Sequence, residues 1–475
     1  MRRGRGMRRV LAAAAATLAA TAVAAPGAQA QPLDDLCSQL SPSGAPCIGA
    51  PKLAERLAAE CRRIGRPADD CQMPLGHRVG REIVERYRGS WLHRTAAFQY
   101  RLASGIPFRD APWLGTHNSF NSVSDPPTLS KTDSNQQLTL PQQLDSDVRS
   151  LELDVHWVPS LDAAGKKAVV VCHGRGPDEQ HFGCTNERRL GFELGQIAGW
   201  LAKNPDQVVL LYLEDELGDP AGYTETVATL DELLGPRIYR PRKEDFTAKG
   251  CADLPLGVSR NDVRAAGAQV VLVGNCRAGW ASHVFGWDDV HVESGSTSRY
   301  RDYPSCDASY GRDVYDAKLV RYYEDSTFVS AATDPTATPA EAAAEMLKPA
   351  KVAAMTRCGV NLFGLDQLLP DDGRIDASIW SWAPQKPDRS QGRCAVQRPD
   401  GRWTTRRCQA TRRVACFSDG NWHVTGRAYP FASARAQCQR RGGAFDKPRT
   451  GYDNATLRKA APGDAREIWI DYRLG

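Results

Sequence analysis

Short apolar runs that alternate with helical patterns, between about residues 108 and 370, constrain the fold of this chain more than any other feature. Runs of about four to eight apolar residues are typical of strands that are buried on both faces of a sheet. Strands separated by helices favour a parallel sheet, because parallel strands need a long crossover connection. Roughly 260 residues of this pattern predict an α/β fold, a (β/α)8 barrel of the TIM type. The runs, with the polar residues that end them, fall at residues 111–118, 150–157, 167–173, 207–214, 269–274 and 360–366.

The run at residues 150–157 is unusual because one of its faces is polar. Three aliphatic side chains alternate there with two carboxylates and an imidazole, which is the period of a strand with two distinct faces. An edge strand that turns its polar face to water is one interpretation. The other is a functional site, and polar residues at the ends of the neighbouring runs favour it. The two carboxylates and these neighbours are Glu152, Asp154, His117, Asn118, His173 and Glu214.

In a parallel barrel the C-terminal ends of the strands meet on one face, so these six residues are expected to lie together. Carboxylate and amide oxygens suit a hard cation, Ca²⁺ before Mg²⁺. The two histidines suit proton transfer near neutral pH. The sequence therefore predicts a site that combines a Ca²⁺ ion with an acid–base pair.

Residues 1–30 have the features of a secretory signal peptide, namely a basic start, an apolar run and the ending Ala28-Gln29-Ala30. Arg8 and Arg9 leave both general and twin-arginine export open. All 14 cysteines follow this segment, so we expect disulfides in an oxidising compartment, with zinc binding as a second option. No later run is apolar enough to span a bilayer, and the sequence therefore predicts a secreted, extracellular protein.

Composition and pattern divide the chain into a signal peptide at 1–30, a helical cysteine-containing extension at 31–104, the barrel at 105–377 and a C-terminal module at 378–475. Without the arginines of the signal peptide, 56 basic and 56 acidic residues balance. They are unevenly distributed, since residues 389–475 hold 18 Lys and Arg against 7 Asp and Glu. The basic module predicts an anionic surface as its partner. We expect no nucleic-acid partner, and a monomer.

The polar residues at the strand ends lie in four short motifs: Trp-Leu-Gly-Thr-His-Asn-Ser at 113–119, Leu-Glu-Leu-Asp at 151–154, Cys-His-Gly at 172–174 and Leu-Glu-Asp at 213–215. Together these motifs resemble the catalytic X region of the phosphoinositide-specific phospholipases C, and more narrowly that of the calcium-dependent members. The resemblance extends over roughly residues 108–370 and is strong over its first half. It implies a TIM-type barrel with the activity of a phosphoric diester hydrolase.

The resemblance also implies roles for individual residues. His117 matches the histidine that assists attack and stabilises the transition state, and His173 matches the acid toward the departing glycerol oxygen. The ligands of a Ca²⁺ ion would be Asn118, Glu152, Asp154 and Glu214. Two further residues are substrate-binding candidates from their positions alone. Arg175 follows the second histidine and could contact phosphate, while Asp366 ends the last run and could line the mouth of the barrel.

The C-terminal module carries a Gly-x-Trp motif at 401–403 between paired cysteines, followed by an aromatic, cysteine-containing segment at 429–470. These segments resemble the second and first halves of a C-type lectin-like domain, in swapped order. The resemblance adds a glycan to the candidate partners. Calcium-dependent sugar binding does not follow, because Thr404 and Thr405 stand where the usual asparagine and aspartate would be. The resemblance also implies two disulfides, Cys394–Cys408 and Cys416–Cys438.

From these observations we expect a secreted, calcium-dependent phosphoric diester hydrolase that cleaves the glycerol–phosphate bond of phosphatidylinositol-like lipids at a membrane surface. A glycerophosphodiester or sphingomyelin phosphodiesterase on the same barrel is an alternative. Another alternative is a catalytically inactive adhesion protein that binds a surface or a carbohydrate. The full set of matched residues favours an enzyme over the adhesion protein.

Overall fold

The computed structural model describes residues 81–122, 124–125, 134–173, 184–287, 291–294, 319–324 and 347–475. All of these residues belong to one compact unit, Pro74–Gly475. The predicted signal peptide, residues 31–80 of the predicted extension and Arg175 lie outside the described residues. Within the described ranges, no helix combines the length and the apolar character that a membrane span requires.

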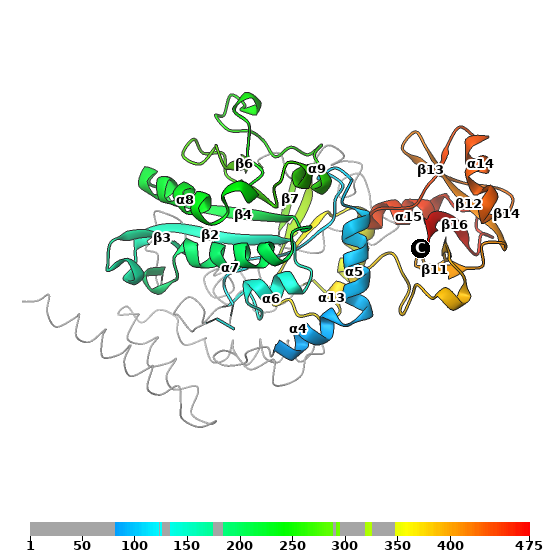
Figure 1. Ribbon diagram of the computed structural model, residues 1–475, viewed down its shortest axis with the longest axis horizontal. Helices are drawn as coiled ribbons and strands as arrows, with labels where there is room; N and C mark the ends of the chain where they lie inside the picture. Colours follow the sequence, from blue (N-terminus) through cyan, green and yellow to red (C-terminus); the bar gives the residue numbers. More distant parts are fainter. Residues whose placement is uncertain are drawn as a thin grey trace, which may run out of the picture. The chain divides into compact units, whose positions relative to one another are not determined.

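A curled, mostly parallel sheet forms the first part of the described chain (Figure 1). Its strands follow the order β6-β5-β4-β2-β1-β9-β8-β7, and each neighbouring pair is parallel. β6 and β7 are its two ends, and among the described residues no pairing between them closes the sheet. The predicted α/β class and the parallel, barrel-like sheet are confirmed. The strands are β1 (Trp113–Thr116), β2 (Ser150–Pro159), β4 (Val209–Glu216), β5 (Val270–Gly274), β6 (Val284–Gly286), β7 (His291–Ser294), β8 (Val320–Tyr323) and β9 (Leu362–Leu365).

The run at residues 167–173 was predicted as a parallel strand of the barrel, and this prediction was wrong. β3 (Lys167–Val171) pairs antiparallel with β2. Only residues 160–166 connect the two strands, which is too few for the crossover that a parallel pair needs, so a hairpin forms. The hairpin returns the chain to the level of Asp154, whose carbonyl oxygen accepts a hydrogen bond from the Cys172 N–H at 3.1 Å.

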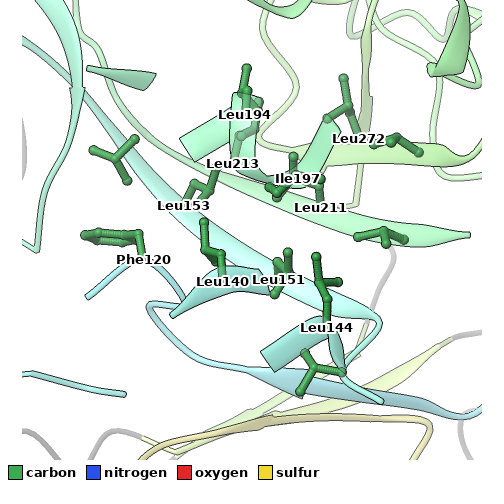
Figure 2. Close-up of a cluster of buried hydrophobic side chains, with 14 of the residues drawn as sticks. Phe120, Leu140, Leu144, Leu151, Leu153, Leu194, Ile197, Leu211, Leu213 and Leu272 are labelled. Carbon is green, nitrogen blue, oxygen red and sulfur yellow. The ribbon is translucent and has the colours of Figure 1, made fainter. Parts of the chain in front are cut away.

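Helices cover the outer face of this sheet, where α6 (Leu140–Asp145) and α7 (Leu190–Lys203) pack against β2 and β4 (Figure 2). The leucines of the two strands meet leucine and isoleucine side chains of the two helices, and burying each such side chain contributes about 1.5–3 kcal/mol. The remaining helices of this part are α4 (Arg81–Arg88), α5 (Trp91–Leu102), α8 (Pro220–Leu233), α9 (Arg260–Ala265), α12 (Pro349–Cys358) and α13 (Arg374–Ser378). The side chains labelled in Figure 2 include Leu140, Leu144, Leu151, Leu153, Leu194, Ile197, Leu211 and Leu213.

The inner face of the sheet carries a second apolar cluster. Side chains alternate between the two faces of a strand, so residues next to the outward leucines of β2 and β4 point inward. On β2 the inward residues include Glu152 and Asp154, and on β4 the inward positions change from apolar or aromatic residues to acidic ones toward the C-terminal end. The cluster includes Trp113, Leu210, Val271, Val273, Phe285, Trp287, Tyr323 and Leu362.

Gly364 makes room inside the sheet for the ring of Tyr323. A Cβ atom added at Gly364 would overlap that ring, whose centroid lies 5.9 Å from the centroid of the His117 ring. We expect Gly364→Ala to lower the free energy of unfolding by about 1–3 kcal/mol, because overpacking forces the ring to move. Urea unfolding measures this change. The control is Gly195→Ala on α7, where a new Cβ meets nothing within 4 Å and stability should be unchanged or higher. Wild-type stability of the Gly364 variant would contradict the packing described here.

The C-terminal part of this unit is an α+β module with its own sheet and two disulfides. Its sheet has the order β11-β10-β16-β12-β13, and β14 and β15 both pair with β12. The disulfides Cys394–Cys408 and Cys416–Cys438 confirm the two that were predicted. Two further disulfides, Cys172–Cys184 and Cys251–Cys276, lie in the barrel part. The module consists of β10 (Cys394–Gln397), β11 (Trp403–Arg406), β12 (Thr411–Ser418), β13 (Asn421–Val424), β14 (Tyr429–Pro430), α14 (Ala434–Gln439), β15 (Ala444–Phe445), α15 (Gly451–Ala460) and β16 (Ile468–Arg473).

Candidate active site

Three carboxylates meet on the inner side of the sheet, two from the first half of β2 and one from near the C-terminal end of the neighbouring strand β4. Each of Glu152, Asp154 and Glu214 contributes one oxygen to a group in which all three oxygens lie within 4.8 Å of one another. The parallel pairing of β2 with β4 creates this group, because Asp154 lies opposite Glu214 in the register. Glu152 and Asp154 are only 3% and 4% exposed. The strand register therefore assembles the acidic cluster that the sequence predicted.

Burial makes the ionised form of these carboxylates costly. Loss of solvent raises the pKa of Glu152 to about 7; the charge of His117 opposes this rise and that of Glu214 adds to it. Burial, followed by repulsion from Glu214 and Glu152, raises the pKa of Asp154 well above its ordinary value. Three carboxylates this close can all be ionised only if a positive charge joins them.

Asn118, in the turn after β1, faces the acidic cluster. Its φ of 43° is the left-handed conformation, which asparagine adopts more readily than most residues other than glycine. Its backbone N–H donates to Glu152 Oε2 at 3.1 Å. With its side-chain nitrogen turned toward Asp154, the amide would donate to both carboxylate oxygens, at 2.9 and 2.7 Å. If the amide oxygen of Asn118 faces Asp154 instead, two acceptor oxygens lie against each other. A cation between the two groups is then needed to stabilise the contact.

The donor set at this position fits a hard divalent cation. It offers three carboxylates and one amide oxygen, which are the ligand types that Ca²⁺ prefers in proteins. A bound cation would also add positive charge beside Glu152 and Asp154, and would lower the pKa values of these two carboxylates again. The predicted metal ligands therefore form a group that is chemically suited to Ca²⁺.

His117 directly follows β1 and is 14% exposed at its side chain. Its Nδ1 lies 3.1 Å from Oδ1 of Asp366, which directly follows β9. Asp366 has no exposed surface and has the His117 imidazole as a partner, and its contact with a substrate stays a prediction. Glu324 fixes this aspartate, because its Oε2 accepts from the Asp366 N–H at 2.6 Å. Arg374 in turn pairs with Glu324 at 2.9 Å.

His173 reaches the same site through the β2–β3 hairpin. The residue before it, Cys172, is hydrogen-bonded to the backbone of β2 and joined to Cys184 by a disulfide. The Nδ1 atom of His173 lies 3.4 Å from the side-chain nitrogen of Asn121, in the loop after β1. The structure therefore brings all six residues predicted from the strand ends into one connected site, although one of the contributing strands is antiparallel.

Arg321 of β8 is a cation in this site that the sequence analysis missed. Its guanidinium lies over the rings of Trp287, Tyr323 and Tyr212, at 3.9, 5.1 and 5.2 Å from their centroids. Burial raises the pKa of Glu152, and the charge of Arg321 opposes that rise. The signal available in the sequence was a charged residue at an inward position of the short alternating segment 320–323, within a stretch that otherwise has no clear period.

The acidic cluster should make the metal-free protein less stable as pH rises. The folded protein has a Glu152 pKa of about 7 against an ordinary value of 4.5, so between these values it binds more protons than the unfolded chain. The free energy of unfolding therefore falls as pH rises from about 4.5 to 7. Urea unfolding in a chelator at pH 5 and pH 8 measures this dependence. Glu152→Gln should flatten it, and an equally steep dependence in the variant would show that other groups are responsible.

The chain is similar to known proteins over much of its length. A family model described as the Rv2075c PI-PLC-like domain matches residues 72–372. The Mycobacterium tuberculosis protein Rv2075c is 51% identical over 446 residues, which cover 92% of this chain and 91% of that protein. Among solved structures, the phosphatidylinositol-specific phospholipase C from Listeria monocytogenes has a TM-score of 0.40 at 18% identity, covering 60% of this chain and 97% of that chain. A calcium-dependent phosphoinositol-specific phospholipase C from Pseudomonas sp. has a TM-score of 0.32 at 14% identity, covering 56% of this chain and 92% of that chain.

Proposed function

This chain belongs to the Rv2075c PI-PLC-like family of phosphoric diester hydrolases, and on that premise we propose that it is a secreted, calcium-dependent phospholipase C. Its substrate is a phosphatidylinositol-like lipid, in which it cleaves the glycerol–phosphate bond. The observation that carries this proposal is the buried acidic cluster beside His117, with His173 linked to His117 through side-chain contacts of Asp366, Asn135 and Asn121. A cluster of three carboxylates suits a divalent cation, and a pair of histidines suits general acid–base catalysis.

The oxygen-bearing side chains of the site are the proposed ligands. Bound there, Ca²⁺ would stabilise the charge that develops on the phosphoryl oxygens and acidify a neighbouring hydroxyl of the substrate. The chain contributes the fixed positions of its ligands, set by the β2–β4 register and by the N–H of Asn118 on Glu152. The four ligands are Asn118, Glu152, Asp154 and Glu214.

The histidines take the two proton-transfer roles. His117 accepts the proton of the attacking hydroxyl at Nε2, because its Nδ1 is held by Asp366. His173 donates a proton to the departing glycerol oxygen. With an inositol headgroup, the ring hydroxyl next to the phosphate attacks phosphorus and the bond to glycerol oxygen breaks, which yields a cyclic phosphodiester and a diacylglycerol. Each proton transfer is typically worth about 10²–10⁴-fold in rate.

Headgroup release from a panel of phospholipid vesicles tests the function. The panel contains phosphatidylinositol, sphingomyelin and phosphatidylcholine, with a soluble glycerophosphodiester beside them, each in Ca²⁺ and in chelator. The proposal predicts release from phosphatidylinositol that requires Ca²⁺. Release from sphingomyelin or the glycerophosphodiester alone would support the alternative phosphodiesterases. No release from any substrate would favour an inactive surface-binding protein.

We also propose that the C-terminal module holds the enzyme near an anionic surface. Several of its arginines are neutralised internally, such as Arg406 and Arg412 on Glu467, but 18 basic residues still face only 7 acidic ones in this region. We expect the protein to sediment with anionic vesicles at low salt and to be released by about 0.5 M NaCl, because exposed charges are screened. Binding that does not change with salt would contradict an electrostatic role, and inhibition by a soluble glycan would favour the lectin-like alternative.

A further inference from the structure

A chain of side-chain amides connects the two histidines of the site. The side-chain nitrogen of Asn135 lies 3.1 Å from Oδ1 of Asp366, the residue that holds His117. The side-chain oxygen of Asn135 accepts a hydrogen bond from the Asn121 amide at 2.9 Å. The same Asn121 nitrogen lies 3.4 Å from Nδ1 of His173. Both asparagines have no exposed surface, so solvent does not take part in these contacts.

The carboxylate at one end fixes the direction of the whole chain. An ionised Asp366 can only accept hydrogen bonds, so Asn135 must turn its nitrogen toward it and its oxygen away. Because that oxygen is an acceptor, Asn121 must present its nitrogen. The same nitrogen lies 3.4 Å from Nδ1 of His173, and an N–H at this distance favours Nδ1 as the acceptor. Each amide orientation follows from the one before it.

The two histidines are consequently held in opposite tautomers. His117 has the carboxylate of Asp366 at Nδ1, so Nδ1 carries the proton and Nε2 is the bare nitrogen that can act as a base. His173 has an N–H donor at Nδ1, so the neutral ring carries its proton on Nε2. The contact of 3.4 Å between Asn135 nitrogen and His117 Nδ1 fits this assignment, since the shorter, charge-assisted contact with Asp366 takes the proton.

We propose that Asn121 and Asn135 are positioning residues that transmit the orientation of Asp366 across the site and so present an unprotonated Nε2 at His117 and a protonated Nε2 at His173. The proposal rests on the proposed function for its catalytic meaning, but the tautomers themselves are a property of the resting protein. Burying side-chain amides away from water costs free energy. These two amides cap no helix, so their place behind the histidines requires an explanation of this kind.

The test is ¹⁵N NMR of histidine-labelled protein, at a pH where both rings are neutral. The wild type should show His117 protonated at Nδ1 and His173 at Nε2. Asn121→Asp has the same shape but no N–H, and it should shift His173 to the Nδ1-protonated form while His117 is unchanged. If that variant does not fold, Asn121→Ala serves instead and should give a mixture of both tautomers at His173. Asn204→Asp, the same exchange at the end of α7, is the control.

Turnover provides the second readout. Asn121→Asp should lower kcat by about 10²-fold or more, the contribution of one general acid, and should change KM little. The proposal is overturned if His173 keeps the wild-type tautomer in both Asn121 variants, or if the wild type shows both histidines in the same tautomer. Correct tautomers in a protein that cleaves none of the phospholipids would overturn the proposed function and leave the proposed amide chain intact.

Discussion

Replacing His117 with alanine lowers the turnover of phosphatidylinositol by about 10²–10⁴-fold and leaves the fold intact. The reason is that the imidazole, held at Nδ1 by Asp366 at 3.1 Å, is the group placed to accept the proton of the attacking hydroxyl. His173→Ala should have an effect of similar size, because it removes the proposed acid. Circular dichroism and Ca²⁺ binding should be those of the wild type in both variants.

A matched control for the His117 variant is available in the same chain. His93 on α5 forms another histidine–aspartate pair, with Nδ1 2.8 Å from Oδ2 of Asp147, away from the acidic cluster. His93→Ala should therefore keep wild-type turnover. Wild-type turnover in His117→Ala, or an equal loss in His93→Ala, would show that the proposed acid–base chemistry does not depend on the residue that we assign to it.

Asp154→Asn abolishes the stimulation of turnover by Ca²⁺, with a loss of roughly 10²–10⁴-fold. A metal that stabilises transition-state charge contributes several kcal/mol, and removing one of three clustered carboxylates weakens the site that would hold it. The same substitution should make the metal-free protein more stable, because burial and two neighbouring carboxylates raise the pKa of Asp154 and make its ionised form unfavourable. A single change with opposite effects on activity and stability is specific to a charged site of this kind.

Isothermal titration with Ca²⁺ and urea unfolding in chelator measure the two effects of Asp154→Asn. Asp371→Asn is the control, since Asp371 is an exposed aspartate in the loop after β9 and should change neither quantity. Equal Ca²⁺ affinity in Asp154→Asn and wild type would contradict the proposed ligand set. A large loss of activity with unchanged Ca²⁺ affinity would instead move Asp154 from metal binding to another role.

The acidic cluster could be predicted from the sequence because the pattern that produces it is local to each strand. In β2 the alternation of Leu151 and Leu153 with the carboxylates fixes which side chains face the helices and which face inward. The end of β4 then adds Glu214 by parallel register alone. The family, the parallel sheet and two disulfides of the C-terminal module could also be predicted, since each depends on short motifs or on regular spacing.

Other features depend on contacts between distant segments, and the sequence carried little signal for them. The hairpin of β3 was missed because its apolar run looks like a parallel strand until the short connection at 160–166 is weighed. Asn121 and Asn135 are ordinary polar residues of loops, and only the folded chain brings them between the two histidines. Asp366 was predicted to lie at the mouth of the barrel because it follows a predicted strand. Nothing in the sequence indicated that this aspartate is buried against His117.

Calcium-dependent cleavage of phosphatidylinositol is tested most directly by a ³¹P NMR time course of phosphatidylinositol vesicles with the purified protein, first in chelator and then after addition of Ca²⁺. We expect no change in chelator and, on addition of Ca²⁺, the growth of a cyclic phosphodiester signal. A signal that grows at the same rate in chelator would contradict a cation held by Glu152, Asp154 and Glu214 as part of the catalytic site.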